Sequence, residues 1–169
     1  MAIHFRAIVL SIFVLAAALA SPVQAQQALT PEDVSTIKTD VTAMMERYVS
    51  ALNRLDSKYI GESTFSNPSI ANGADGVVVK TPEQIAKQYA GTNKSLIEAG
   101  WEKSVIGRYD ICVLSRNSAL ADISWKRVKK DGYILVEGAG TYVVTKDKSG
   151  WHITMILGHA LNKMVTCTN

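Results

Sequence analysis

The sequence is poor in the residues that build metal and redox centres. Its 169 residues include only two cysteines and three histidines, and neither Cys-x-x-Cys nor His-Glu-x-x-His occurs. Gly-x-Ser-x-Gly, the motif of many serine hydrolases, and a glycine-rich phosphate loop are also missing. These absences predict a domain with no metal and no other cofactor, and they argue against the enzyme classes that carry those motifs.

The chain also lacks a strong charge bias and a long apolar run. Its 18 basic and 15 acidic residues predict no nucleic-acid partner. The apolar run Ala7–Ala20 is shorter than the about 20 residues that span a bilayer. It follows the basic start Met1–Arg6 and precedes the small-x-small site Val23-Gln24-Ala25, as in a secretory signal peptide.

We therefore expect residues 1–25 to be a signal peptide cleaved after Ala25, with an uncleaved anchor as the alternative. Cleavage removes Arg6 and leaves 17 basic and 15 acidic residues, a net charge of +2. The mature protein is then secreted or periplasmic and is not attached to a membrane.

Export bears on Cys112 and Cys167, the only cysteines. An oxidising compartment favours a disulfide between them. The strand order derived below argues against it, because it places the two residues at opposite ends of a sheet, whereas bridged Cα atoms lie within about 7 Å. The sequence therefore does not decide between a Cys112–Cys167 disulfide, free thiols and an intermolecular disulfide.

The rest of the chain forms one domain over residues 31–161, between a short tether at residues 26–30 and a tail at residues 162–169. Thr30-Pro31 begins an amphipathic helix that we expect to end at Leu55. A short hairpin over residues 64–70 and 76–80 follows, and Thr81-Pro82 begins a second helix over residues 82–90, with a less certain continuation.

Four strands complete the domain. A strand over residues 101–114 leads into three more in the stretch Ala119–His159, in which apolar and polar residues alternate. Trp151, Leu157 and His159 fall in one alternating row of the last strand. Three successive strands with short turns predict an antiparallel meander whose apolar face the helices cover. The fold class is therefore α+β.

This pattern resembles the NTF2-like superfamily, which includes the SnoaL-like proteins and is also called cystatin-like. The resemblance rests on Val49-Ser50-Ala51-Leu52-Asn53-Arg54-Leu55-Asp56, Thr81-Pro82-Glu83-Gln84-Ile85 and Ser149-Gly150-Trp151-His152-Ile153. It implies a roll in which a curved antiparallel sheet wraps round a long N-terminal helix. It implies no single function, because the superfamily includes isomerases, cyclases, dehydratases and binding modules.

Arg47-Tyr48-Val49-Ser50-Ala51-Leu52-Asn53 looks like the first helix of ketosteroid isomerase. The resemblance puts the oxyanion-donor tyrosine at Tyr48, the base at Asn67 and the protonated acid near Gly140. An amide cannot take a proton from carbon, and a glycine has no side-chain donor. Of the three functional side chains of the isomerase, only the tyrosine is present, so we do not expect the isomerase mechanism here.

Other candidates have competing interpretations. Tyr48 is a ligand donor or a core tyrosine, and Asn67 is a ligand contact or an Asx-turn residue. His159 is an acid or base at the mouth of a cavity, or a structural residue at a strand end. Trp125 and Tyr142 are cavity walls or ordinary core. The basic hairpin tip at residues 126–130 is a solvated turn or a contact for anionic lipid.

We therefore expect an exported domain that binds a small, mainly apolar molecule in its cone, without an established reaction. One alternative is an isomerase, dehydratase or cyclase that uses Tyr48 with His159 or with a pocket carboxylate such as Asp122. Another is a structural accessory module. The expected partners are a small-molecule ligand and a second copy of the chain, bound through the sheet as a homodimer.

Overall fold

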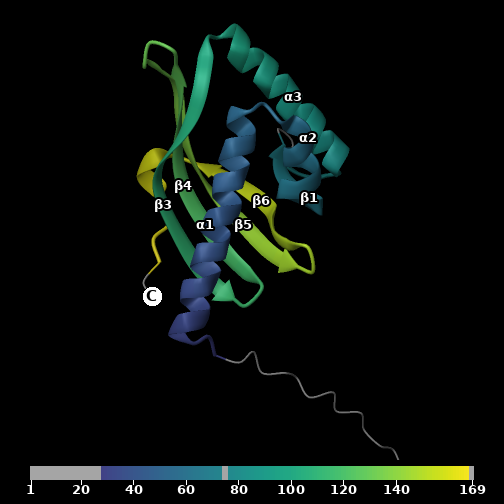
Figure 1. Cartoon of the computed structure of the whole chain (residues 1–169), viewed down its shortest axis with the longest axis vertical. Coiled ribbons are helices and arrows are strands. Elements are labelled where there is room, and N and C mark those ends of the chain that lie inside the picture. Colours follow the sequence, from purple (N-terminus) through teal and green to yellow (C-terminus); the bar gives the residue numbers. More distant parts are fainter. Residues whose placement is uncertain (1–27, 74–75, 168–169) are drawn as a thin grey trace, which may run out of the picture.

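A computed structural model describes residues 28–73 and 76–167 of the chain (Figure 1). The predicted signal peptide lies outside the described residues, as does the beginning of the tether. The elements, in chain order, are α1 (Pro31–Asn53), α2 (Ser57–Tyr59), the π-helix η1 (Ile60–Thr64), β1 (Phe65–Gly73), β2 (Gly76–Lys80), α3 (Pro82–Glu98), β3 (Trp101–Ser115), β4 (Ser118–Lys129), β5 (Ile134–Asp147), β6 (Gly150–His159) and the 3₁₀ helix η2 (Leu161–Lys163).

Both long helices begin where the sequence predicts, and each has a complete capping box. The Asp33 amide donates to the Thr30 hydroxyl at 3.1 Å, while Asp33 Oδ2 accepts from the Thr30 amide at 2.9 Å. Thr81 and Gln84 make the equivalent pair at the start of α3. Each box satisfies backbone donors that the first turn of a helix leaves without partners.

The second helix is longer than expected, because α3 continues past Gly91 to Glu98. A glycine inside a helix costs about 0.5–1 kcal/mol. Contacts beyond it offset this cost, since Asn93 is buried and its amide donates to the Leu55 carbonyl at 3.3 Å. The first helix ends two residues earlier than expected, at Asn53.

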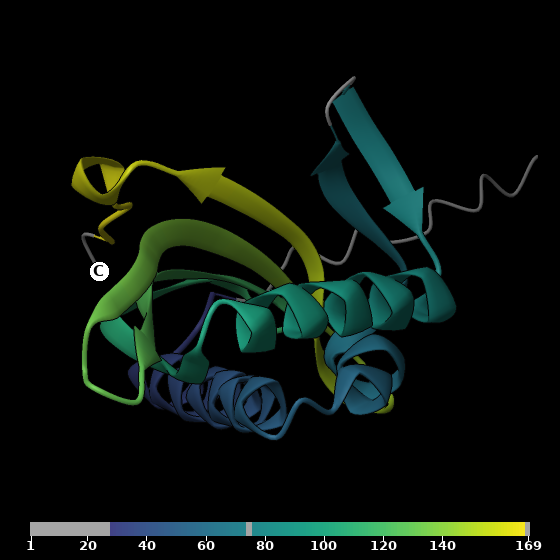
Figure 2. The same cartoon turned by 90° about the horizontal axis from the view of Figure 1, so that it is seen from above.

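The six strands form one sheet in the order β2-β1-β6-β5-β4-β3. The predicted antiparallel meander runs from β3 to β6. The sheet as a whole is mixed rather than antiparallel, because β1 pairs with β6 in parallel. This pairing joins residues at least 85 positions apart in the chain, such as Ile70 and Met155, and the alternation within a single strand contains no information about it. The β1–β2 hairpin stands away from the rest of the domain (Figure 2).

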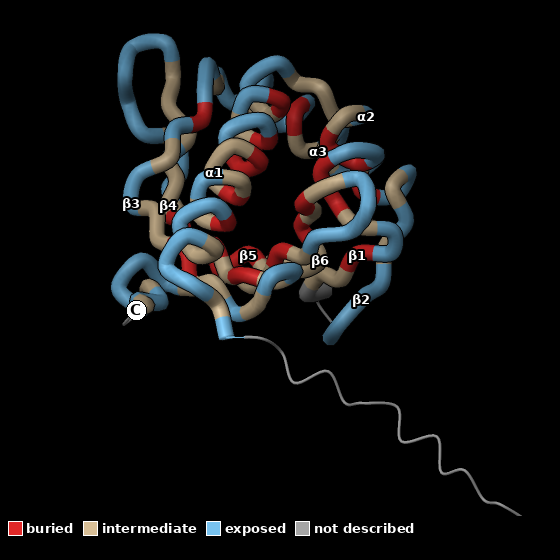
Figure 3. Tube along the Cα trace, turned by 60° about the horizontal axis from the view of Figure 1, so that its bottom comes forward, coloured by how far each residue is buried: buried red, intermediate tan, exposed pale blue. Residues whose placement is uncertain are grey.

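The meander curves strongly and α1 lies in its hollow (Figure 2). We call the face toward α1 the inner face of the sheet and the opposite one the outer face. Buried residues line the side of α1 that faces the sheet and the strands opposite it (Figure 3). The fully buried side chains include Val41 and Met45 of α1, together with Ala119, Val144 and Ile153 of the sheet. The expected roll round an N-terminal helix is confirmed.

Cys112 and Cys167 form a disulfide, with their Cα atoms 5.4 Å apart. The expectation that the two lie at opposite ends of the sheet is wrong, because the chain reverses after His159. The eight residues from there to Cys167 include η2 and bring the C-terminal segment back beside β3 (Figure 1). Eight residues span up to roughly 26 Å, enough to return along the sheet.

None of the helices within residues 28–73 and 76–167 combines the length and the apolar character that crossing a bilayer requires.

We predict that the start of α1 loses stability in acid. Both carboxylate oxygens of Asp33 accept from the Arg116 guanidinium, at 2.5 and 2.9 Å, which ties α1 to the β3–β4 turn. The Thr30 amide and Arg116 lower the pKa of Asp33 from 3.8 to about 2. A depressed pKa stabilises the fold above pH 3.8, and this contribution is lost as the pH falls to 2.

Urea unfolding at about pH 5 and about pH 2.5, on either side of the ordinary carboxyl pKa, tests this. Asp33→Asn should lower the free energy of unfolding at about pH 5. The decrease in this free energy between about pH 5 and about pH 2.5 should be smaller in Asp33→Asn than in the wild type. Glu102→Gln, a change at an exposed carboxylate of β3, is the matched control and should leave this decrease unchanged. An identical pH dependence in Asp33→Asn and the wild type would contradict the assignment.

Candidate functional site

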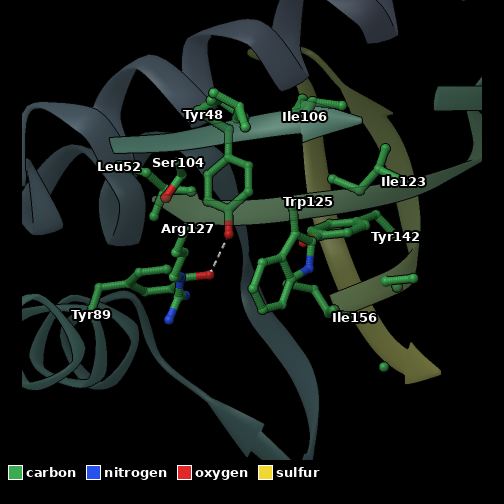
Figure 4. A pocket seen from close by; sticks show the side chains of 15 residues that line it. Tyr48, Leu52, Tyr89, Ser104, Ile106, Ile123, Trp125, Arg127, Tyr142 and Ile156 are labelled. Atoms are coloured by element: carbon green, nitrogen blue, oxygen red, sulfur yellow. Dashed lines mark hydrogen bonds between the residues drawn. The ribbon is translucent and has the colours of Figure 1, made fainter. Parts of the chain in front are cut away.

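A cavity of about 220 Å³ lies between the C-terminal half of α1, α3 and the inner face of the sheet (Figure 4). Its walls are mainly apolar, with Leu52 from α1 and Ile106, Ile123 and Ile156 from three strands. Polar groups gather at one end, where Tyr48, Tyr89 and Arg127 meet (Figure 4). An apolar pocket with a few converging polar groups is the usual form of a small-molecule site.

Tyr48, which the sequence left open between a ligand donor and a core tyrosine, lies on the inner side of α1, where it is buried and also forms part of the wall of the cavity. Its hydroxyl is 2.7 Å from the hydroxyl of Tyr89. Burial raises the pKa of Tyr48 well above its ordinary value of 10.0, and it raises the pKa of Tyr89 to about 12. Both phenols are therefore neutral near pH 7 and act as hydrogen-bond donors rather than as bases.

Three further rings pack round Tyr48. Phe65 and Tyr89 meet it edge-on, with ring centroids 6.3 and 6.2 Å away, and Tyr142 is tilted against it at 6.1 Å. Tyr142 lies on the inner face of β5, as predicted, and lines the cavity. These contacts hold the phenols in fixed directions.

Trp125 forms one wall of the cavity because its cross-strand partner is a glycine. It pairs with Gly138, where an added Cβ would come 2.6 Å from the indole ring. Gly140, two residues along the same row, also lines the cavity. The sequence left Trp125 open between a cavity wall and ordinary core, and the resemblance pointed to Gly140; both residues line the cavity. The sequence does not reveal that Gly138 provides the space for the indole.

Arg127 is a cavity residue that the sequence analysis missed, because it grouped Arg127 with the solvated hairpin tip. Its guanidinium carbon lies 5.0 Å from the centre of the Trp125 ring. The period-2 alternation that puts Trp125 on the inner face also puts Arg127 there, two residues later. Continuing the alternation by two residues beyond Trp125 would have predicted Arg127 on the inner face.

Asn67, predicted as a ligand contact, is exposed and does not line the cavity. It belongs to β1, and the Ser66 hydroxyl beside it donates to the Pro68 carbonyl. The structure thus places Asn67 apart from Tyr48 and Gly140, with which the resemblance had grouped it.

His159, which the sequence left open between the mouth of the cavity and a structural place at a strand end, lies on the outer face at the end of β6. A β-bulge puts it there: Val143 pairs with Met155 and Val144 with Ile153, so Thr154 is an extra residue. An extra residue reverses which side chains face inward. Ile156 therefore lines the cavity, and His159 turns outward with Leu157.

On the outer face, His159 Nε2 is 2.9 Å from Oδ2 of the fully buried Asp122. The Thr141 hydroxyl donates to the same oxygen at 2.5 Å. The Ala160 carbonyl and Asp122 raise the pKa of His159. The sheet separates this group from Tyr48, so neither His159 nor Asp122 can act with Tyr48 on one ligand.

A serine, a histidine and an aspartate also meet at the β5–β6 turn, but not as a catalytic triad. The Ser149 hydroxyl donates to Asp147 at 2.6 Å and is 2.8 Å from His152 Nε2. In a triad the carboxylate accepts from Nδ1 of the histidine, whereas His152 Nδ1 has no partner among the described residues. Within residues 28–73 and 76–167, no cluster of three metal-binding side chains occurs.

Comparison with known proteins identifies a family. Residues 38–161 match a family model described as "NTF2-like protein (DUF6841)". No curated protein matches the sequence.

Solved structures share the fold. A nuclear transport factor 2 (NTF2-like) superfamily protein from Salmonella enterica is 22% identical, with a TM-score of 0.54 over 75% of this chain and 92% of that one. An NTF2-like protein with a cystatin-like fold from Novosphingobium aromaticivorans is 14% identical, with a TM-score of 0.63 over 77% and 85%. The protein Aln2 from a Streptomyces species is 13% identical, with a TM-score of 0.61 over 80% and 96%. Identities this low establish the fold and nothing more.

We predict that the hydroxyls of Tyr48 and Tyr89 stabilise the domain as a pair. Tyr48→Phe and Tyr89→Phe each remove one partner of a buried hydrogen bond and little volume, so each should lower the free energy of unfolding by about 1 kcal/mol. The double variant should cost less than the two single losses added together, because the second change removes a bond that is already broken.

Urea unfolding of the wild type, the two single variants and the double variant measures this coupling. Tyr133, which is 73% exposed, provides the control, since Tyr133→Phe should add to Tyr48→Phe without coupling. Strictly additive losses for Tyr48 and Tyr89 would show that the two hydroxyls do not interact.

Proposed function

The chain belongs to the NTF2-like family, and from this premise we propose that it binds a small, mainly apolar molecule in the cavity. The composition of the cavity wall carries this proposal. Aliphatic and aromatic side chains surround a small number of hydroxyl groups and one guanidinium. The cavity has a volume of about 220 Å³. Pockets that bind drug-sized ligands are larger, with volumes of about 300–1,000 Å³. A ligand with one or two rings suits this cavity better than a steroid.

Binding without catalysis is favoured over an isomerase, dehydratase or cyclase. Tyr48 and Tyr89 could stabilise a developing oxyanion, as such an enzyme requires. None of the described residues that line the cavity is a carboxylate or a histidine, and the raised pKa values make the phenols poor bases. The lining can thus polarise a bound oxygen but lacks a group to accept a proton from carbon.

The proposal includes export of the protein. The Cys112–Cys167 disulfide supports it, because such bonds persist in secreted and periplasmic proteins and are rare in reducing compartments. The ligand would then be a molecule met outside the cytoplasm.

Obstructing the cavity tests the proposal. Gly158 lies at the exposed rim of the cavity, and an added Cβ there meets no atom within 4 Å. We expect Gly158→Leu to narrow the entrance to the ligand space and to weaken the binding of 2-naphthol, a neutral two-ring probe, at least tenfold. Ligand-detected NMR and calorimetry measure the affinity.

Gly91→Leu is the matched control. Gly91 is exposed on α3, and an added Cβ there also meets nothing within 4 Å, so this variant should bind 2-naphthol as the wild type does. Equal affinities for folded Gly158→Leu and wild type would show that the probe does not occupy the cavity and would overturn the proposal.

A further inference from the structure

We propose that the ligand is an organic monoanion, with a carboxylate held by Arg127 and by the Tyr48–Tyr89 hydroxyl pair and an apolar body against Trp125. This inference rests on the proposed function and specifies the chemical class of its ligand. Three independent features of the cavity support it: an arginine without a counter-ion, a free phenolic proton, and apolar walls at the other end.

Arg127 is a charge without a partner. It lies on the inner face of β4 between Ser104 and Val136 of the neighbouring strands. Among the described residues it forms no ion pair, and the residues lining the cavity include no carboxylate. Its outward neighbour Lys126, in contrast, pairs with Glu137 at 3.7 Å. A partly buried cation is costly unless it is paired, so a ligand anion would remove an unfavourable charge.

The hydroxyl pair supplies a second donor at the same end. The bond between the Tyr48 and Tyr89 hydroxyls, at 2.7 Å, uses one phenolic proton. The Tyr142 hydroxyl also interacts with that of Tyr48, and three hydroxyls that make two bonds with one another still leave one proton available for an acceptor. Arg127 and Tyr89 lie beside each other in the cavity (Figure 4), near enough that the guanidinium charge lowers the pKa of Tyr89 against the effect of burial.

A carboxylate matches this set of donors. It only accepts hydrogen bonds, has two oxygens, and fits the planar guanidinium fork with both of them. One guanidinium neutralises one negative charge, so a carboxylate is favoured over a phosphate dianion. The indole of Trp125 stacks beneath the guanidinium and keeps it from turning freely toward solvent.

The other end of the cavity determines the rest of the ligand. Ile123 and Ile156 line it, on the side of the cavity away from Arg127 (Figure 4), and they offer no hydrogen bond to a polar group. An aromatic or short aliphatic body would therefore bury its apolar surface there while its acid group stays at Arg127.

Two probes of the same shape and different charge test this inference. We would titrate 2-naphthoate and the neutral 2-naphthamide into the wild type and into Arg127→Met, which keeps an unbranched apolar stem against Trp125. The wild type should bind the naphthoate at least tenfold more tightly than the amide. Arg127→Met should abolish this preference and should change the affinity for the amide less than twofold.

Lys126→Met is the matched control, since it removes the adjacent, outward-facing charge; it should keep the full preference for the naphthoate. Equal affinities of the two probes for the wild type, or a preference that survives in Arg127→Met, would overturn the inference. The proposed function would still stand if the wild type bound both probes and Gly158→Leu prevented their binding. Failure of both probes to bind the wild type at millimolar concentration would overturn the inference and the proposed function together.

Discussion

The packing of α1 into the hollow of the curved sheet is the constraint on which the rest of the structure depends. Near the β3–β4 turn the sheet presents small side chains such as Ala119 and Ala121, both fully buried, and α1 packs closely against them. Farther along β4, Trp125 and Arg127 replace these small residues, while on β5 Gly138 lies opposite Trp125 and Gly140 lies opposite Ile123. The helix and the sheet therefore leave a cavity at this end, and its chemistry is that of the residues that border it.

The polar groups of this cavity suit binding better than proton transfer. Two phenols and a guanidinium are donors near pH 7, and the carboxylate and imidazole that could act as bases, Asp122 and His159, lie together on the outer face. The proposed ligand would therefore present an oxygen that accepts hydrogen bonds from these groups. The same fold supports enzymes elsewhere in its superfamily, and the difference here lies in which side chains the inner face carries.

Sequence alone predicts the elements of this fold well, because each has a local signal. Capping residues such as Thr30 and Thr81 determine where the helices begin, and alternation reveals the meander. Helical spacing and strand alternation also put Tyr48, Trp125 and Tyr142 on apolar faces, and in the structure all three line the cavity. Alternation does not predict the side of the sheet on which His159 lies, because one extra residue in β6 changes which of the following side chains face inward. It cannot show the parallel β1–β6 pairing or the Tyr48–Tyr89 contact, which join distant segments in space.

The existence of an apolar cavity beneath α1 is the central claim, and crystals of the protein pressurised with xenon test it most directly. Xenon enters apolar cavities without needing a hydrogen bond. The account predicts a xenon peak among Trp125, Ile123 and Ile156, with the Tyr48–Tyr89 contact unchanged. Crystals without such a peak, in which these side chains meet and fill the space, would contradict it.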